Sequence, residues 1–212
     1  MNKIVSILFA SIIFTTSAYA GGLIGLKVGN GELEATRAEI VNTPTTLNEA
    51  ADTQNVDHLY GAIFAELNIN DGPLNLGFEL VPLSGTISVA TDNTDASAEV
   101  GNLRTIYALA AREVGGGSVY AKLGYSEADI DNAKQSNGTT TITSFSDSLE
   151  GPMIGIGYQT GEYNGLVFRA EATLTDFDDV EVKTTDIDGL VETKKANDVE
   201  FQTFTLSVAK AF

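Results

Sequence analysis

The sequence predicts an all-β fold, an eight-stranded antiparallel up-and-down β-barrel, and three observations support this prediction. Apolar residues alternate with small or polar residues along eight segments, which is the period of a β-strand with two different faces. The connections between these segments alternate between short and long. No segment after residue 21 shows a sustained helical periodicity. The eight predicted strands are 22–29, 58–67, 74–81, 103–112, 119–126, 153–159, 166–175 and 201–212.

Each of the first four segments has one face that is assigned as apolar. These faces carry Ile24, Leu26 and Val28, then Leu59, Ile63, Ala65 and Leu67, then Leu76, Phe78 and Leu80, and finally Leu103, Tyr107 and Leu109. The opposite faces carry small residues and the charged residues Lys27, Glu66, Glu79, Arg104 and Arg112. Phe64 and Ile106 are large apolar residues on the polar side, so the alternation is imperfect.

The last four segments repeat the pattern. Their apolar faces carry Val119, Ala121, Leu123 and Tyr125, then Ile154, Ile156 and Tyr158, then Leu166, Phe168, Ala170 and Leu174, and finally Phe204, Leu206, Val208 and Phe212. Their opposite faces carry glycine, serine and threonine together with Lys122, Arg169 and Glu171. Lys210 falls on the apolar face of the last segment, where it departs from the pattern.

The lengths of the connections predict how the strands close. Three connections, 68–73, 114–118 and 160–165, are short and contain the turn-forming residues Asp71-Gly72-Pro73, Gly115-Gly116-Gly117 and Asn164-Gly165. Four connections, 32–57, 82–101, 126–150 and 175–200, are long. Antiparallel strands joined in this order place all short turns at one end of the barrel and all long loops at the other.

Composition and charge exclude several classes of function. The chain has 212 residues, a formal charge of -17, one His and no Cys. The acidic balance argues against a nucleic-acid partner, which needs clustered Lys and Arg. The absence of Cys excludes disulfides, thiolate metal sites and a cysteine nucleophile. The four long connections together carry -18, which is the whole charge of residues 21–212.

The first twenty residues predict export. Lys3 precedes an apolar stretch over 4–14, and Ala18-Tyr19-Ala20 supplies a small-residue cleavage site. This is the pattern of a secretory signal peptide, and the apolar stretch is shorter than the ~20 residues of a spanning helix. We therefore expect a signal peptide over 1–20 and a mature barrel domain over 21–212.

An even number of antiparallel strands with short turns at one end and long loops at the other is typical of outer-membrane barrels. The last segment, with Phe204, Leu206 and Val208 on one face and Phe212 at its end, resembles the C-terminal assembly signature of those proteins. Over residues 21–212 the chain resembles the small eight-stranded family of opacity-protein-like and attachment-type surface antigens. The resemblance implies a monomer in the cell outer membrane, periplasmic short turns, extracellular loops, and outer-membrane lipid and the barrel-assembly machinery as partners.

A soluble eight-stranded barrel of the lipocalin type is the structural alternative, because period two does not say which face points inward. Two observations favour the membrane orientation. The polar face is rich in small residues such as Gly25, Gly77 and Gly157, as a narrow eight-stranded lumen requires. A soluble protein also has no reason to confine its net charge to the loops at one end.

The charges on the polar faces are then expected to meet in the lumen. Eight strands enclose an interior that side chains fill, so these charges should pack at close quarters as one network that closes the barrel. Counting from the short-turn ends places Lys27, Glu79, Lys122, Arg169 and Glu171 near mid-height. The full predicted network is Lys27, Glu66, Glu79, Arg104, Arg112, Lys122, Arg169 and Glu171.

The function predicted from these features is that of a non-enzymatic surface protein. The barrel would anchor acidic loops for adhesion, shielding or envelope integrity, with a ligand on a host or neighbouring cell. A small porin-like channel is one alternative, although open porins use about 16–18 strands. A lipid-modifying enzyme is another, but His58 is the only His and no G-x-S-x-G motif accompanies it.

The acidic residues of the long loops are also candidate metal ligands. Asp176, Asp178 and Asp179 crowd one loop, and Asp186-Ile187-Asp188-Gly189 follows, but the twelve-residue EF-hand pattern with its closing Glu is missing. No phosphate-binding glycine motif is present. The sequence therefore predicts no catalytic residue, no metal site and no cofactor.

Overall fold

The structure is a computed structural model that describes residues 21–42, 46–47, 53–69, 72–82, 85–91, 94–135, 140–145, 148–186 and 191–212. The predicted signal peptide, 1–20, lies outside the described residues. Within the described ranges, no helix is long and apolar enough to cross a membrane.

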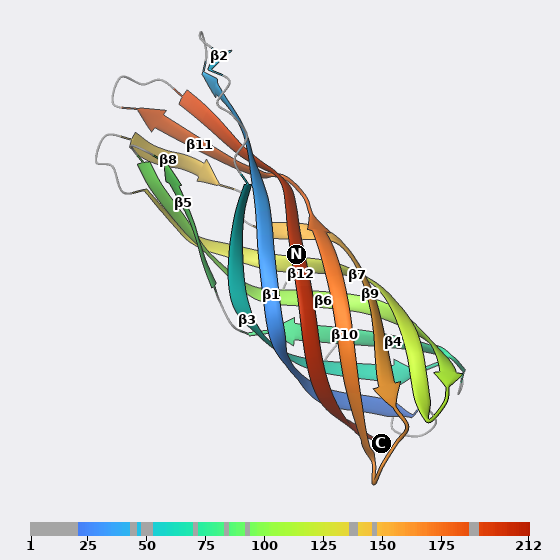
Figure 1. The fold of residues 1–212 in the computed structure, drawn as a ribbon. Coiled ribbons are helices and arrows are strands. Elements are labelled where there is room, and N and C mark those ends of the chain that lie inside the picture. Colours follow the sequence, from blue (N-terminus) through green and yellow to red (C-terminus); the bar gives the residue numbers. More distant parts are fainter. Residues whose placement is uncertain are drawn as a thin grey trace.

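Eight long strands form a closed antiparallel barrel, which confirms the predicted fold (Figure 1). They are β1 (Gly22–Asn42), β3 (Thr53–Asn68), β4 (Leu74–Val81), β6 (Thr94–Val114), β7 (Gly117–Gln135), β9 (Ser148–Thr160), β10 (Leu166–Phe177) and β12 (Val191–Ala211). Each strand pairs with the next along this series, and β1 pairs with β12 to close the barrel.

The ranges predicted as long loops contain much more strand than the sequence pattern indicated. β1, β6 and β12 have 21 residues each, about twice the 9–11 that cross a membrane. Four shorter strands also lie at this end of the barrel: β2 (Thr46–Leu47), β5 (Gly85–Thr91), β8 (Thr140–Phe145) and β11 (Val180–Asp186). The prediction that 32–57, 82–101, 126–150 and 175–200 are loops throughout is therefore wrong.

The short turns lie where the sequence placed them. Asn164 and Gly165 both have positive φ, 53° and 77°, and Tyr163 and Leu166 exchange two backbone hydrogen bonds of 2.9 Å around them. This is the type I′ hairpin that Asn-Gly favours. Gly115, in the turn between β6 and β7, has a φ of 63°, a conformation that glycine adopts without the strain a side chain would add.

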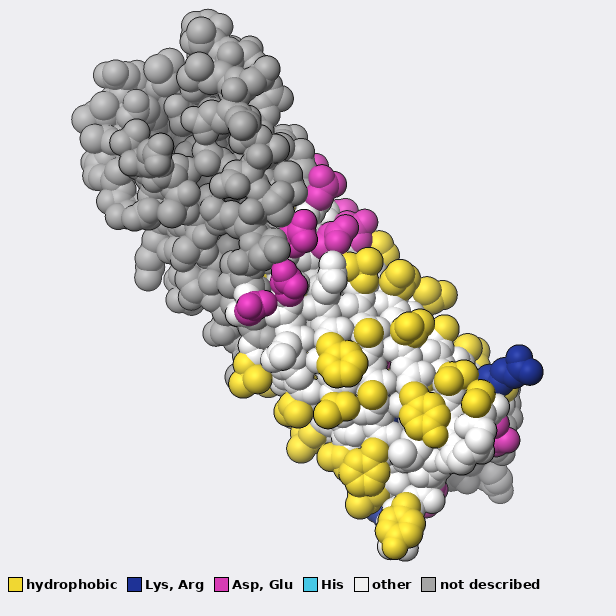
Figure 2. Space-filling view, viewed as in Figure 1, with side chains coloured by type: hydrophobic (Ala, Val, Ile, Leu, Met, Phe, Trp, Pro, Cys, Tyr) yellow, Lys and Arg dark blue, Asp and Glu magenta, His cyan; other side chains and the backbone are white. Residues whose placement is uncertain are grey.

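The apolar faces point outward and the charged faces point inward. Val28, Leu123 and Ile156 are 62 to 69% exposed, whereas Lys27 and Lys122 are at most 5% exposed. Figure 2 shows the exposed hydrophobic side chains spread over the barrel wall. A soluble barrel would have the reverse arrangement, so this is the orientation of a barrel surrounded by lipid.

The face assignment for 103–112 is wrong. Tyr107 and Leu109 are buried inside the barrel, at 5% and 0% exposure, while Ile106 is 47% exposed on the outside. Both faces of this segment are largely apolar, so the alternation gives no clear direction. Inside the barrel, Tyr107 occupies the space that Gly77 leaves on the neighbouring strand, because a Cβ at Gly77 would overlap the Tyr107 ring.

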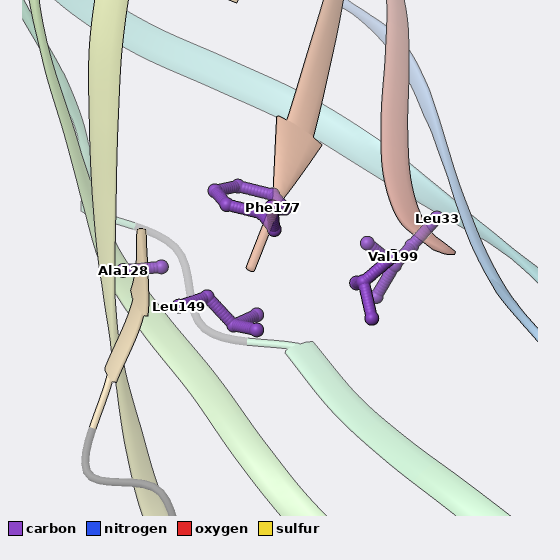
Figure 3. Close-up of a cluster of buried hydrophobic side chains, with 5 residues drawn as sticks. All are labelled: Leu33, Ala128, Leu149, Phe177 and Val199. Carbon is purple, nitrogen blue, oxygen red and sulfur yellow. The ribbon is translucent and has the colours of Figure 1, made fainter. Parts of the chain in front are cut away.

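The strands reverse their polarity above the membrane-facing band. In β1, Val28 faces outward and Lys27 inward, but four residues further on Glu32 is exposed and Leu33 is buried. The inward residues above the reversal form an apolar cluster of Leu33, Ala128, Leu149, Phe177 and Val199. Figure 3 shows these five side chains directed into the barrel interior from different strands.

The outward residues above the reversal form an acidic collar. Its members are partly or fully exposed and alternate with the buried apolar residues: Glu32, Glu34, Asp57, Glu127, Asp129, Glu150, Asp176, Asp198 and Glu200. In Figure 2, acidic side chains gather at the upper edge of the apolar band. The register places some of these carboxylates directly opposite one another, as in Glu34–Glu200 and Glu127–Glu150. Like charges opposed in this way require water, so the collar lies outside the hydrocarbon.

Candidate functional site: the charged lumen

Four charged side chains from four strands form a closed ring inside the barrel. Lys27 Nζ lies 2.6 Å from Glu79 Oε2 and 2.5 Å from Glu171 Oε1. Lys122 Nζ lies 2.9 Å from Glu79 Oε2 and 3.2 Å from Glu171 Oε1. Each lysine therefore contacts both carboxylates, and each carboxylate contacts both lysines.

A second ion pair lies beside this ring. Arg169 donates two hydrogen bonds to Glu66, of 2.6 and 2.7 Å, in the bidentate geometry that favours guanidinium–carboxylate pairs. The Tyr107 hydroxyl donates to Glu66 at 2.8 Å. The Arg169 guanidinium also lies 5.3 Å from the centre of the Phe64 ring. Glu66 is thus held by two donors from strands far apart in the sequence.

Two tyrosines connect the two groups of charges, and a third contacts the ring alone. Tyr120 donates to Glu171 at 3.0 Å while its ring lies 5.4 Å from the Arg169 guanidinium. Tyr107 donates to Glu66, and its ring lies 3.8 Å from Lys122 Nζ. Tyr60 donates a hydrogen bond to Glu79. Ring and ion pair therefore form one connected cluster.

The cluster is balanced in charge and closed to water. Among the described side chains it contains three cations and three carboxylates, and none of these six is more than 5% exposed. Burying a charge is costly unless it is paired and hydrogen-bonded, which each of these groups is. Because an eight-stranded barrel is only wide enough for its own side chains, the cluster fills the lumen at this height.

The structure brings six of the eight residues of the predicted network together: Lys27, Glu66, Glu79, Lys122, Arg169 and Glu171. It does not bring Arg104 and Arg112 to them. Arg104 lies 2.5 Å from Asp129 and 3.4 Å from Glu127, where side chains are 25 to 34% exposed. Arg112 is exposed near the short-turn end. Both arginines lie outside the cluster because β6 turns toward the lumen the face opposite to the one predicted.

Sequence reasoning did not identify the aromatic members of the cluster. Tyr107 lies opposite Gly77, Tyr120 opposite Gly157, and Phe64 opposite Gly25 in the strand register. At each glycine, a Cβ would overlap the aromatic ring of the partner. Pairs of glycine and an aromatic residue at opposed positions were the signal that could have located these rings in the lumen.

The residues of the predicted assembly signature lie on the outer face. Phe204, Leu206, Val208 and Phe212 are 39 to 62% exposed. Phe212 exchanges two backbone hydrogen bonds of 3.0 Å with Gly22, at the seam between β1 and β12. The recognition of this strand by the assembly machinery stays a prediction.

The remaining candidate residues form no described site. His58 lies on β3, but its side chain is outside the described part of the structure. Ser126, a serine on β7 that a lipid-modifying enzyme would need near His58, is 1% exposed and shares a 2.8 Å hydrogen bond with Thr105. In the described ranges, no group of three or more His, Cys, Asp or Glu side chains could hold a metal ion. Of the predicted acidic loop, residues 187–190 lie outside the described residues.

An apolar outer band around a filled, charge-paired lumen defines a small eight-stranded outer-membrane β-barrel. The fold is similar to that of the outer membrane protein OprG from Pseudomonas aeruginosa, with a TM-score of 0.69 and 11% identity over 92% of this chain and 97% of that one.

Two further structures match with lower scores. Ail, the attachment invasion locus protein of Yersinia pestis, gives a TM-score of 0.44 and 12% identity over 90% of this chain and 99% of its own. Neisserial surface protein A gives a TM-score of 0.43 and 12% identity over 86% of this chain and 96% of its own. No family model and no curated protein matches the sequence.

Proposed function

We propose that this protein is a non-enzymatic outer-membrane anchor with a closed lumen, which holds acidic segments at the cell surface. The observation that carries this proposal is the lumen itself. The ring of Lys27, Glu79, Lys122 and Glu171 joins strands on different sides of the barrel and fills its interior. Such a barrel offers no open path for solutes, which supports an anchoring role over a channel.

The strands above the membrane support the second half of the proposal. Their inward residues, such as Leu33 and Phe177, form an apolar core, and their outward residues form the acidic collar. This is the arrangement of a water-soluble β-structure. The barrel therefore continues outside the bilayer as a stalk that presents carboxylates, which hydrate the surface, repel acidic partners and favour cationic ones.

The closed lumen is tested by single-channel conductance in planar bilayers. The wild type is expected to show no steady conductance. Large, steady wild-type conductance would contradict the anchor and support the channel instead.

The acidic surface is tested on intact cells. Replacing Asp176, Asp178 and Asp179 by Asn removes three exposed carboxylates at the top of β10. We expect cells that express this variant to bind less polylysine than cells with equal amounts of wild type. A matched control replaces Glu113 and Glu162, two exposed carboxylates at the short-turn end, by Gln. Equal polylysine binding by wild type and the Asn variant would contradict the surface display.

The enzyme alternative has a separate test. His58→Ala is expected to leave the lipid A profile of the cell unchanged in mass spectrometry. A changed profile at equal expression would replace the anchor by a lipid-modifying activity.

A further inference from the structure

The outer surface of the barrel carries a groove of about 580 Å³ that crosses β6, β7, β9, β10 and β12. Its floor is made of alanines and Ile156, which the register places side by side. Ala110 pairs with Ala121, Ala121 with Ile156, and Ile156 with Ala172. Phe204, opposite Ala172, lines one end. The volume lies within the roughly 300–1,000 Å³ typical of ligand pockets.

One end of the groove is positively charged. Arg112 lines it, is exposed, and pairs in register with Val119 close to the short turn between β6 and β7. Within the described residues, no carboxylate forms an ion pair with Arg112. Glu113 follows Arg112 on the opposite face of the strand. The groove therefore combines an apolar floor in the membrane with an exposed guanidinium at the height of the lipid headgroups.

We propose that this groove binds an anionic glycerophospholipid from the leaflet around the short turns. An acyl chain lies on the alanine floor, and the headgroup phosphate meets Arg112. Guanidinium groups bind phosphate with paired hydrogen bonds, which are strong because both partners are charged. In outer-membrane barrels the short turns face the periplasm, so the lipid comes from the periplasmic leaflet.

A second groove on the same surface provides the comparison. It has about 440 Å³ and is lined by residues that include Leu76, Ile106, Leu123 and Phe212. No Lys or Arg lines it. It therefore takes lipid chains without a preference for an anionic headgroup.

The chain contains no Trp, so an introduced Trp reports on one position. Val119→Trp places the reporter in the charged groove and Leu76→Trp in the uncharged one, each two residues from the start of its strand at the short-turn end. The full chain is folded into phosphatidylcholine vesicles in which a minor fraction of lipid carries brominated chains, which quench Trp fluorescence on contact. One series uses brominated phosphatidylglycerol and the other brominated phosphatidylcholine.

We expect Val119→Trp to prefer brominated phosphatidylglycerol about fivefold, since one Arg attracts anionic lipid by ~1 kcal/mol. Leu76→Trp should show no preference. Adding Arg112→Gln should abolish the preference, whereas Lys210→Gln, which removes another exposed cation at this end, should retain it. Adding Ala121→Leu should reduce quenching by both lipids.

Three results would overturn the proposal. Equal preference at both reporters would mean that the bilayer surface, and not the groove, selects the lipid. Loss of the preference with Lys210→Gln to the same extent as with Arg112→Gln would mean the same. Protection of Val119→Trp from both quenchers, together with crosslinked dimers, would assign the groove to a second copy of the chain.

Discussion

Replacing Glu79 by Ala removes the carboxylate that two buried lysines share. Glu79 is 3% exposed, and its Oε2 atom lies 2.6 Å from Lys27 Nζ and 2.9 Å from Lys122 Nζ. The Tyr60 hydroxyl donates to the same carboxylate. No other described side chain of the cluster can take the place of the Glu79 carboxylate.

The expected loss of stability follows from the charges that remain in the lumen. Without Glu79, both lysines depend on Glu171, at 2.5 and 3.2 Å, because Glu66 is engaged by Arg169. Two cations then share one anion, and the lumen changes from neutral to a net charge of +1. Removing one partner of a buried ion pair costs roughly 3–5 kcal/mol, a large part of the ~5–15 kcal/mol that stabilises a typical domain.

The assay is urea unfolding in phosphatidylcholine vesicles, followed by circular dichroism. Glu127→Ala is the matched control, because its partner Arg104 lies 3.4 Å away and both side chains are 25 to 31% exposed. We expect Glu79→Ala to lower the free energy of unfolding by about 3–5 kcal/mol and Glu127→Ala by less than ~1 kcal/mol.

A double variant distinguishes the effect of an unpaired buried charge on stability from the effect of lost packing. Lys27→Met with Glu79→Leu removes one cation and one anion and leaves Lys122 paired with Glu171 at 3.2 Å. It should recover most of the stability lost in Glu79→Ala, since an ion pair replaced by apolar residues is often nearly neutral. A loss of under ~1 kcal/mol for Glu79→Ala, or no recovery in the double variant, would refute the charge-pairing argument.

Of three further predictions, two use the same unfolding assay and one measures folding yield. Arg169→Ala leaves Glu66 with only the Tyr107 hydroxyl as a described partner and should cost about 3–5 kcal/mol; a smaller loss than for Arg104→Ala would contradict the burial of this pair. Gly29→Ala should lower folding yield, because a Cβ there overlaps the Phe204 carbonyl oxygen at the β1–β12 seam, whereas Gly116→Ala, with no atom within 4 Å, should fold normally. Leu123→Arg, on the lipid face, should cost about 2–4 kcal/mol and Glu32→Arg, in the acidic collar, about 0–1; equal costs would show that the two residues are not on opposite sides of the membrane surface.

Much of the barrel could be predicted because most segments alternate without ambiguity. In 22–29, Ile24, Leu26 and Val28 are apolar and Lys27 is charged, so the direction of each face follows. The segment 103–112 lacks this contrast, since Ile106, Ala108 and Ala110 oppose Tyr107 and Leu109. Its direction is set by tertiary packing, in which Gly77 leaves room for the Tyr107 ring inside the barrel. A single strand read alone carries no such information.

The sequence predicts most of the charged residues of the candidate site, but it does not predict which of them contact each other. Alternation puts Lys27, Glu79, Lys122 and Glu171 on inward faces, and counting from the turns puts them at a similar height. Which lysine meets which carboxylate depends on the stagger between strands, which the sequence does not state. The hydroxyl donors Tyr60 and Tyr120 depend on the same stagger: Tyr60 on β3 meets Glu79 on the neighbouring strand β4, and Tyr120 meets Glu171 two strands away, across Gly157.

The extent of the strands was missed because their polarity reverses. A search for apolar residues on one face ends at Val28 in β1, although the hydrogen-bonded ladder continues beyond Glu34. Beyond that point the alternation continues with the opposite sense, Leu33 inward and Glu32 outward. The same change occurs in β10, where Arg169 and Glu171 face inward below Phe177. One strand therefore carries two successive alternation patterns of opposite polarity. A search for either pattern alone ends where the other begins.

The reversal also fixes the depth of the barrel in the membrane. Moving the chain toward the periplasm would draw the carboxylates of the acidic collar, such as Glu32 and Asp176, into hydrocarbon. Moving it outward would expose residues such as Val28 and Leu123 to water. Both displacements are unfavourable, and they oppose each other at the height where the lumen changes from charged to apolar. The charged lumen and the acidic stalk thus meet at the membrane surface. The alternation that directs charged side chains into the lumen below this height directs carboxylates outward above it, and these carboxylates keep the stalk out of the membrane.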